Sequence, residues 1–205
     1  MSIILRGSPF STFTWSARLA LVEKGVEYEL VAANLREEAY ANFHPWRMMP
    51  VLDHDDFRVF EAAAVMRYVD EAFEGPALQP ADPKSRALMT QWMSAYGDYV
   101  APAAVRGVLI PRFVLAPRGI QVDDASVHAA ATKAHSALRI FDAALGRSPF
   151  LAGNTPSLAD WLLLPTVASG GGLTGPDRYT DDLHNIGAWM GRMTARPSFG
   201  ATLPH

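Results

Sequence analysis

The pattern of the chain changes at Gly75–Pro80, where two prolines and a glycine indicate a linker. Before this stretch, segments with strand-like alternation and segments with helical spacing follow one another, whereas after it only helical spacing remains. Alternating strands and helices predict a small mixed sheet covered by helices. We therefore expect an α/β domain at residues 1–76, a linker at 77–82 and an all-α domain at 83–205.

The first 76 residues predict the order β-α-β-α-β-β-α. A strand and a Gly7-Ser8-Pro9 turn lead into a helix that ends at Lys24-Gly25, a cation followed by glycine, as is common at helix ends. The segments expected in this part are a strand over 2–6, a helix over 12–24, a strand over 26–32, a helix or helical turn over 35–43, strands over 51–53 and 57–60, and a helix from 61 onward. In the second part we expect helices over 83–100, continuing to 115 with a break at Pro102, and over 123–145, 157–168 and 183–195.

Composition excludes several kinds of chemistry. The chain has no cysteine, which removes disulfides, thiolate metal sites and a cysteine nucleophile. A net charge of −3 gives no basic field for nucleic acid or a membrane surface, and no signal peptide or membrane-spanning run is visible. His128 and His135 are two helical turns apart, about 10 Å, too far to share a metal. We expect a cytoplasmic protein with no metal site.

The stretch from Arg47 to Glu71 combines two features that suit a small peptide. Pro50 forces Met49 into an extended conformation and leaves its backbone groups free to pair with an extended ligand. Eleven residues later, a helix begins beside Glu61, so free N–H groups and a carboxylate lie together. An anion and a cation would both be attracted there, as in the carboxylate and amine of an amino acid. A strand-ending proline and an acidic helix start are also common without any ligand.

Two further motifs are interpreted as structural. Ser157-Leu158-Ala159-Asp160 has the form of a capping box with Asp in place of Glu, at the start of an apolar helix. The run Ser169–Gly172 lacks the lysine and the preceding strand of a phosphate-binding loop, and we expect a plain loop.

Six segments, in order and with matching spacing, resemble the soluble (cytosolic-type) glutathione S-transferase superfamily. They are SPFSTFTWSARLALVEKGVEYELV, HPWRMMPVL, FEAAAVMRYVDEAF, QWMSAYGDYVAP, FLAGNTPSLADWLLLP and AWMGRMTARPSF. The resemblance implies a thioredoxin-like N-terminal domain that binds glutathione as co-substrate and an all-helical domain that lines the second-substrate pocket. It also implies a cis peptide bond before Pro50, a homodimer and a role in detoxification.

The resemblance also places the catalytic hydroxyl at Ser11, between the first strand and the first helix, as in the serine-type (theta-, phi- or zeta-like) classes. We expect a bacterial member of these classes. A hydroxyl that donates to the glutathione sulfur stabilises the thiolate, and the helix N-terminus adds a favourable field. Lowering a thiol pKa by two units requires about 2.7 kcal/mol, within reach of these two effects. Thr12 or Thr14 could take this role instead, and Ser11 could simply cap the helix.

Carried over from the family, the residues expected to bind glutathione are Phe10, Arg47, Met49, Pro50, Glu61, Ala62 and Asp98. Met49 would pair through its backbone with the cysteinyl part, Glu61 would take the γ-glutamyl amine and Ala62 would offer its N–H to the γ-glutamyl carboxylate. Ala62 stands where the family usually has serine, and Arg47 and Met48 where it usually has Lys or Gln. His44 replaces an asparagine and is interpreted as structural.

The second substrate is less well defined by the sequence. Residues expected to line its pocket are Phe13, Tyr96, Tyr99 and Arg106, with Arg112 on a flanking helical stretch. Arg106 would favour an anionic co-substrate, and the short C-terminus predicts an open pocket.

Several functions agree with these features. The leading hypothesis is a glutathione S-transferase that attacks an electrophilic small molecule. A zeta-like glutathione-dependent cis–trans isomerase is the alternative suggested by Ser11, Trp15 and the RLAL run, although Phe13 replaces the cysteine expected there. A glutathione peroxidase or disulfide reductase, or a non-catalytic transferase-like binding module, are the remaining options.

Overall fold

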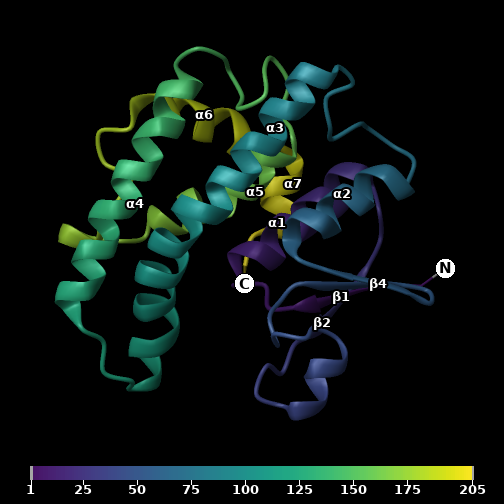
Figure 1. Cartoon of the computed structure of the whole chain (residues 1–205), viewed down its shortest axis with the longest axis horizontal. Coiled ribbons are helices and arrows are strands. Elements are labelled where there is room, and N and C mark those ends of the chain that lie inside the picture. The colour runs from purple at the N-terminus through teal and green to yellow at the C-terminus, as the bar shows by residue number, and fades with distance from the viewer. Residues whose placement is uncertain (1, 205) are drawn as a thin grey trace.

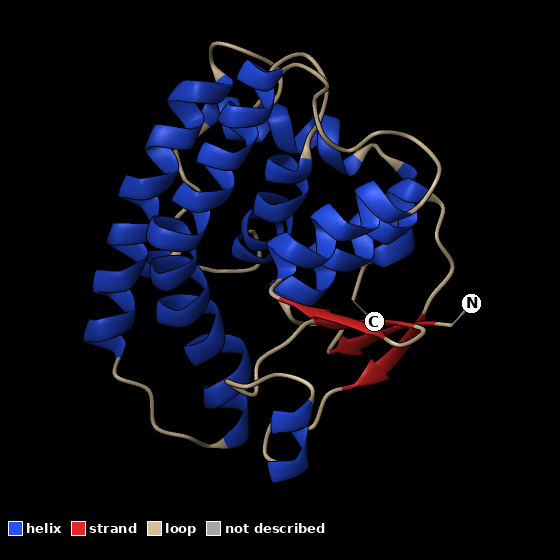
Figure 2. Cartoon of the chain, turned by 45° about the vertical axis from the view of Figure 1, so that its right-hand side comes forward, coloured by secondary structure: helices blue, strands red, loops and turns tan. Residues whose placement is uncertain are grey.

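The computed structural model describes residues 2–204, which form a sheet-containing part followed by a helical part (Figure 1). The sheet has the strand order β2-β1-β3-β4, with β1 parallel to β2 and antiparallel to β3, and β3 antiparallel to β4. Helices α1 and α2 cover one face of the sheet, and the short 3₁₀ helix η1 lies beyond the other (Figures 1 and 2). The elements are β1 (Ile3–Gly7), α1 (Thr12–Lys24), β2 (Glu29–Ala32), η1 (Glu38–Asn42), β3 (Val51–His54), β4 (Phe57–Phe60) and α2 (Ala62–Ala72).

The predicted order β-α-β-α-β-β-α is confirmed, and so are the bounds of α1. Its first turn is capped by Ser11, and it ends at Gly25, whose φ of 75° is a left-handed conformation that glycine adopts without strain. Alternate residues of β1 are buried under the helices, with Leu5 opposite Leu52 of β3 in the core.

Two predicted elements are shorter in the structure. The second strand begins at Glu29 rather than at Val26, because the Val26 N–H bonds back to the Leu21 carbonyl and completes the end of α1. The helix expected over 35–43 is only the 3₁₀ turn η1.

The second part consists of helices joined by loops (Figure 2). It consists of α3 (Pro83–Ala95), η2 (Tyr96–Leu109), η3 (Pro111–Leu115), η4 (Ala116–Arg118), α4 (Asp124–Leu145), α5 (Leu158–Gly170), η5 (Gly175–Asp177), α6 (His184–Thr194) and α7 (Pro197–Thr202). The break predicted at Pro102 is wrong, since Pro83–Arg118 is one continuous helical segment. Within it, η2 and η3 are wider π-type turns, in which Ile110 N–H donates to the Val105 carbonyl five residues earlier.

The segment Pro83–Arg118 also meets, by length and composition only, the requirement for crossing a membrane. One such helix is weak evidence, because core helices of soluble proteins meet the same requirement. In the structure its π-helical portion η2 packs against α4 and α5.

Helix α1 is held by both parts of the molecule. It packs against α2 on the sheet side and against α5 and α7 of the helical part. The Trp15 indole Nε1 donates to Thr202 Oγ1 at 2.8 Å, and Arg18 donates to the Thr202 carbonyl at 2.8 Å. Because Ser11 is the N-cap residue immediately before α1, these contacts fix the orientation of the helix next to the predicted catalytic hydroxyl.

The segment between α2 and α3 is tied down by a buried ion pair. Lys24 Nζ lies 2.9 Å from Asp70 Oδ1 and 3.2 Å from the Pro76 carbonyl, and Asp70 also accepts from the Leu78 N–H and the Gln79 amide. Burial raises the pKa of the Asp70 carboxyl, but these hydrogen bonds and the Lys24 charge outweigh it and hold the pKa below its usual value.

Replacing Asp70 by asparagine is expected to lower the free energy of unfolding by about 1–3 kcal/mol at neutral pH, because Lys24 loses its buried counter-charge. Since the pKa of Asp70 is depressed in the folded state, this stabilisation is present above the unfolded pKa and is lost as pH falls through the folded one. Urea unfolding should show a large difference in the free energy of unfolding between wild type and variant at about pH 7 and a smaller difference at about pH 3. An equal gap at both pH values would contradict this role.

Candidate active site at the start of helix α1

Ser11 lies at the junction between β1 and α1, where it is the N-cap of the helix. Its Oγ accepts a hydrogen bond from the Thr14 N–H at 3.3 Å. A serine hydroxyl has one donor and two acceptor positions, so this bond leaves the Ser11 O–H available as a donor. The side chain is half-buried, so a ligand can still reach it. Capping and donation to a ligand are therefore compatible.

The two neighbouring threonines are less accessible. Thr14 is completely buried, and its side chain packs so closely on Gly7 that a Cβ at Gly7 would collide with Thr14 Oγ1. Thr12 is 5% exposed, and neither hydroxyl has a hydrogen-bond partner within residues 2–204. Of the three hydroxyls considered from the sequence, that of Ser11 is the one that solvent and ligands can approach.

The Met49–Pro50 peptide bond is cis, as the resemblance implies. Val51, the next residue, begins β3 and pairs with Arg6 of β1. Met49 itself is half-buried and, among the backbone hydrogen bonds of the described loops, neither donates nor accepts. Arg47 is exposed and has a φ of 48°, which is uncommon for a residue other than glycine.

Glu61 occupies the N-cap position of α2 in an unusual backbone conformation. Its φ is 69° and its ψ is 121°, and its side chain is 66% exposed. Such conformations cost free energy and cluster at ligand-binding sites. Ala62, the first residue of the helix, is buried, so it can offer a ligand only its backbone N–H.

His44 lies beside Glu61, which the sequence did not indicate. Its ring is buried, and its Nε2 lies 3.8 Å from Glu61 Oε1. Burial lowers the pKa of His44, while the Glu61 carboxylate acts in the opposite direction and only partly offsets it. His44 is therefore neutral at physiological pH.

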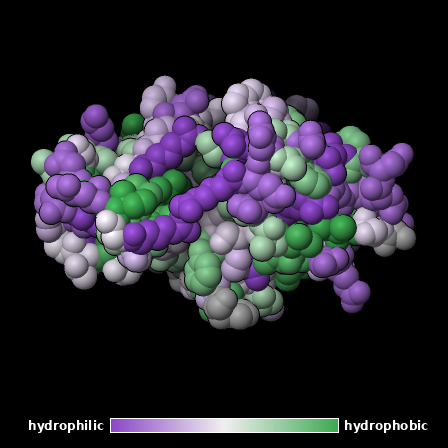
Figure 3. Space-filling model, turned by 90° about the horizontal axis from the view of Figure 1, so that it is seen from below, coloured by the Kyte–Doolittle hydropathy of each residue, from purple (hydrophilic) through white to green (hydrophobic). Residues whose placement is uncertain are grey.

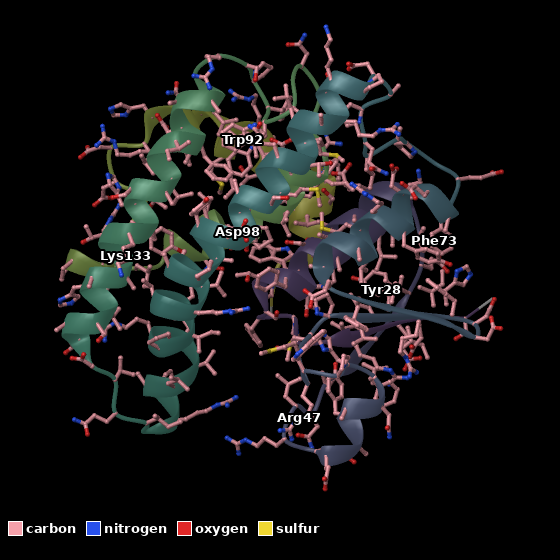
Figure 4. All side chains as sticks on the ribbon, viewed as in Figure 1. Tyr28, Arg47, Phe73, Trp92, Asp98 and Lys133 are labelled. Atoms are coloured by element: carbon pink, nitrogen blue, oxygen red, sulfur yellow. The ribbon has the colours of Figure 1, made fainter. Side chains whose placement is uncertain are left out.

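The helical part contributes exposed side chains from η2. Asp98 and Tyr99 are exposed, and so is Arg106 two turns further along. In Figure 4, Asp98 lies on the helix at the centre of the view, while Arg47 lies in the loop at the lower end of the sheet-containing part. Viewed from below, two apolar patches are separated by a band of hydrophilic side chains (Figure 3).

Tyr96 is placed differently from the prediction. It is 1% exposed, and its hydroxyl lies 2.7 Å from Thr166 Oγ1 of α5. Burial raises the pKa of Tyr96 to about 12, against the smaller lowering by the Thr166 hydroxyl. Phe13 packs edge-on against its ring at 5.8 Å. This burial does not support Tyr96 as a pocket residue.

Two hollows on the described surface lie away from these residues. One, of about 340 Å³, lies between the end of α1 and the end of α2, and the other, of about 450 Å³, lies on the outer face of α4. Within residues 2–204, no group of three or more His, Asp or Glu side chains is arranged to hold a metal ion.

Comparison with known proteins identifies the family. Models of the glutathione S-transferase N-terminal and C-terminal domains match residues 1–71 and 98–197. Glutathione S-transferase F14 of Arabidopsis thaliana is 32% identical over 93% of this chain and 80% of its own length, and F10 of the same plant is 28% identical over 94% and 92%. The crystal structure of glutathione transferase F7 from Populus trichocarpa is 25% identical, has a TM-score of 0.88 and covers 98% of this chain and 97% of its own. The predicted fold, a thioredoxin-like α/β domain followed by an all-α domain, is confirmed, and the chain belongs to the glutathione S-transferase family.

Proposed function

We propose that this protein activates glutathione as a thiolate through Ser11 and transfers it to an electrophilic small molecule. The family makes the protein a glutathione transferase with glutathione as its co-substrate. The single observation that supports Ser11 is its half-buried hydroxyl, which caps α1 and still has its proton to donate. The mechanism belongs to the serine type, and a bacterial source remains a prediction because the relatives compared above are plant proteins.

Ser11 acts on the sulfur of the bound tripeptide. Its O–H donates to the thiolate more strongly than to the thiol, because hydrogen bonds to charged acceptors are about twice as strong. The free N–H groups at the start of α1 add a positive field. Both effects stabilise the anion and lower the thiol pKa, so that more of the bound glutathione is nucleophilic at neutral pH.

The rest of glutathione lies across the segments that precede β3 and α2. The free backbone of Met49, preceding Pro50, pairs with the cysteinyl part in the manner of an added strand. Glu61 binds the γ-glutamyl amine, the Ala62 N–H binds the γ-glutamyl carboxylate and Arg47 meets the glycine carboxylate. Phe10, which is highly exposed next to Ser11, covers the ligand.

The electrophile binds between the start of α1 and η2. Phe13, Tyr99 and Arg106 contribute to this site, and the guanidinium of Arg106 favours an anionic co-substrate. The enzyme is a homodimer in which Asp98 extends towards the glutathione amine bound by the partner subunit. It acts in the cytoplasm. Light scattering is expected to give the mass of a homodimer, and the mass of a monomer would contradict this assembly.

The activity is tested with purified protein, glutathione and a panel of aryl halides, peroxides and maleyl compounds. Conjugation with consumption of glutathione supports the transferase. Isomerisation of a maleyl compound without glutathione consumption would support the zeta-like alternative, and peroxide reduction the peroxidase. Binding to immobilised glutathione with no turnover of any compound would support a binding module.

Replacing Glu61 by alanine is expected to raise KM for glutathione about 10–100-fold, the loss of a hydrogen bond to a charged group of about 1.5–3 kcal/mol. Initial rates at varied glutathione and saturating electrophile measure the change. Glu74→Ala is the matched control, because Glu74 is an exposed carboxylate beyond the other end of α2. An equal KM in both variants would exclude Glu61 from the glutathione site.

A further inference from the structure

His44 is held rigidly between the two segments assigned to glutathione. It follows η1 in the loop that leads to Met49, and its side chain is 2% exposed. Its ring packs on Phe60 with centroids 4.6 Å apart and meets Trp46 edge-on at 6.0 Å. Phe60 is the last residue of β4 and directly precedes Glu61, so the packing joins the loop to the start of α2.

The hydrogen bonds of His44 determine which ring nitrogen carries the proton. The backbone N–H of Trp46 donates to His44 Nδ1 at 3.3 Å, so Nδ1 is an acceptor. In the neutral imidazole the proton then lies on Nε2. The protonated nitrogen, Nε2, is therefore the one that lies 3.8 Å from Glu61 Oε1.

Glu61 has little else to fix its carboxylate. Its backbone has a positive φ of 69°, and within residues 2–204 its side chain makes no capping hydrogen bond. Among the described residues, His44 is the one basic side chain within 4 Å of its carboxylate, with Nε2 3.8 Å from Oε1. A carboxylate that must meet a ligand amine binds it more tightly when its orientation is fixed beforehand.

We propose that His44 is a positioning residue: its Nε2–H orients the Glu61 carboxylate for the amine of glutathione, and its Nδ1 holds the loop that carries Arg47 and Met49. This inference rests on the proposed role of Glu61. It replaces the structural interpretation made from the sequence, because a buried histidine with one nitrogen on a loop and the other beside an exposed, otherwise unsupported carboxylate links two parts of one site.

Three variants separate the two nitrogens. His44→Gln places an amide nitrogen near the position of Nε2, His44→Asn places its amide nearer Nδ1, and His44→Phe keeps the ring without either nitrogen. We expect KM for glutathione to rise about tenfold in the Asn and Phe variants, the change that corresponds to the loss of one hydrogen bond. In the Gln variant we expect KM to rise by less than about threefold. The value of kcat at saturating glutathione should stay within about twofold in all three, since the contact acts on binding.

Tyr40→Phe is the matched control, because Tyr40 is a buried aromatic residue of η1 whose hydroxyl has no partner within the described chain. It should leave KM unchanged. The His44→Asn change should also add nothing to KM in a Glu61→Ala background, because the two residues act as a unit.

The outcomes distinguish this inference from the function on which it rests. If Glu61→Ala leaves KM for glutathione unchanged, the assignment of Glu61 fails and the role of His44 fails with it. If Glu61→Ala raises KM but His44→Asn does not, only the positioning role is overturned. The same holds if KM for glutathione rises as much in the Gln variant as in the Phe variant. Additive effects in the double variant would also overturn it.

Discussion

Replacing Ser11 by glycine is expected to lower kcat/KM for conjugation by about 10–100-fold near neutral pH, because the pKa of the bound thiol returns towards its free value of about 8.5. Glycine is chosen because it caps a helix almost as well as serine, so α1 should remain intact. The loss comes from a smaller thiolate fraction in bound glutathione. The difference in kcat/KM between wild type and variant should therefore become smaller above about pH 9, where an unassisted thiol ionises by itself. A pH profile of initial rates checks both points.

Thr12→Val and Thr14→Val serve as controls for the Ser11 variant. Both hydroxyls are buried and have no hydrogen-bond partner within residues 2–204, so valine, which matches threonine in shape, removes no hydrogen bond there. Rates close to wild type are expected for these two. A large loss in either variant with none in Ser11→Gly would move the catalytic hydroxyl to a threonine.

Replacing Asp160 by alanine is expected to lower the free energy of unfolding by about 3–5 kcal/mol, because several buried donors lose their partner at about 1–3 kcal/mol each. Asp160 is fully buried and accepts four hydrogen bonds, from Leu151 N–H, Ser157 N–H, Ser157 Oγ and Trp189 Nε1, at 2.8 to 3.0 Å. Alanine would leave these donors unpaired inside the protein. Chemical denaturation followed by tryptophan fluorescence measures the loss.

Asp142 provides the control for Asp160. It is half-buried and accepts from only two groups, the Ile186 N–H and the Asn185 amide, at the start of α6. Asp142→Ala should cost clearly less, about 1–2 kcal/mol. If both variants lost the same stability, the wider network around Asp160 would contribute nothing beyond a helix cap.

Local chemistry made several elements predictable. The bounds of α1 follow from a serine at its start and a Lys-Gly pair at its end, and both act within one turn of the chain. The capping box of α5 was predictable for the same reason. Its bonds to Leu151 and Trp189 were not, because those residues meet Asp160 only through the tertiary fold.

Long-range packing decided the features that the sequence did not predict. Helical spacing cannot tell whether Tyr96 faces a pocket or the core, and its bond to Thr166 of α5 settles the matter in favour of the core. A proline inside a helical pattern usually ends or kinks the helix, but the π-type turns of η2 carry the helix past Pro102. The approach of His44 to Glu61 joins residues on different segments, and no spacing rule indicates it.

The account depends on one physical claim, that the Ser11 hydroxyl stabilises the thiolate of bound glutathione. Titration of the protein–glutathione complex, followed by the ultraviolet absorbance of the thiolate, tests it most directly. The account predicts that the pKa of the bound thiol is about two units below the free value of about 8.5 in wild type and returns towards that value in Ser11→Gly. A lowered pKa that persists unchanged in Ser11→Gly, or no lowering in wild type, would contradict it.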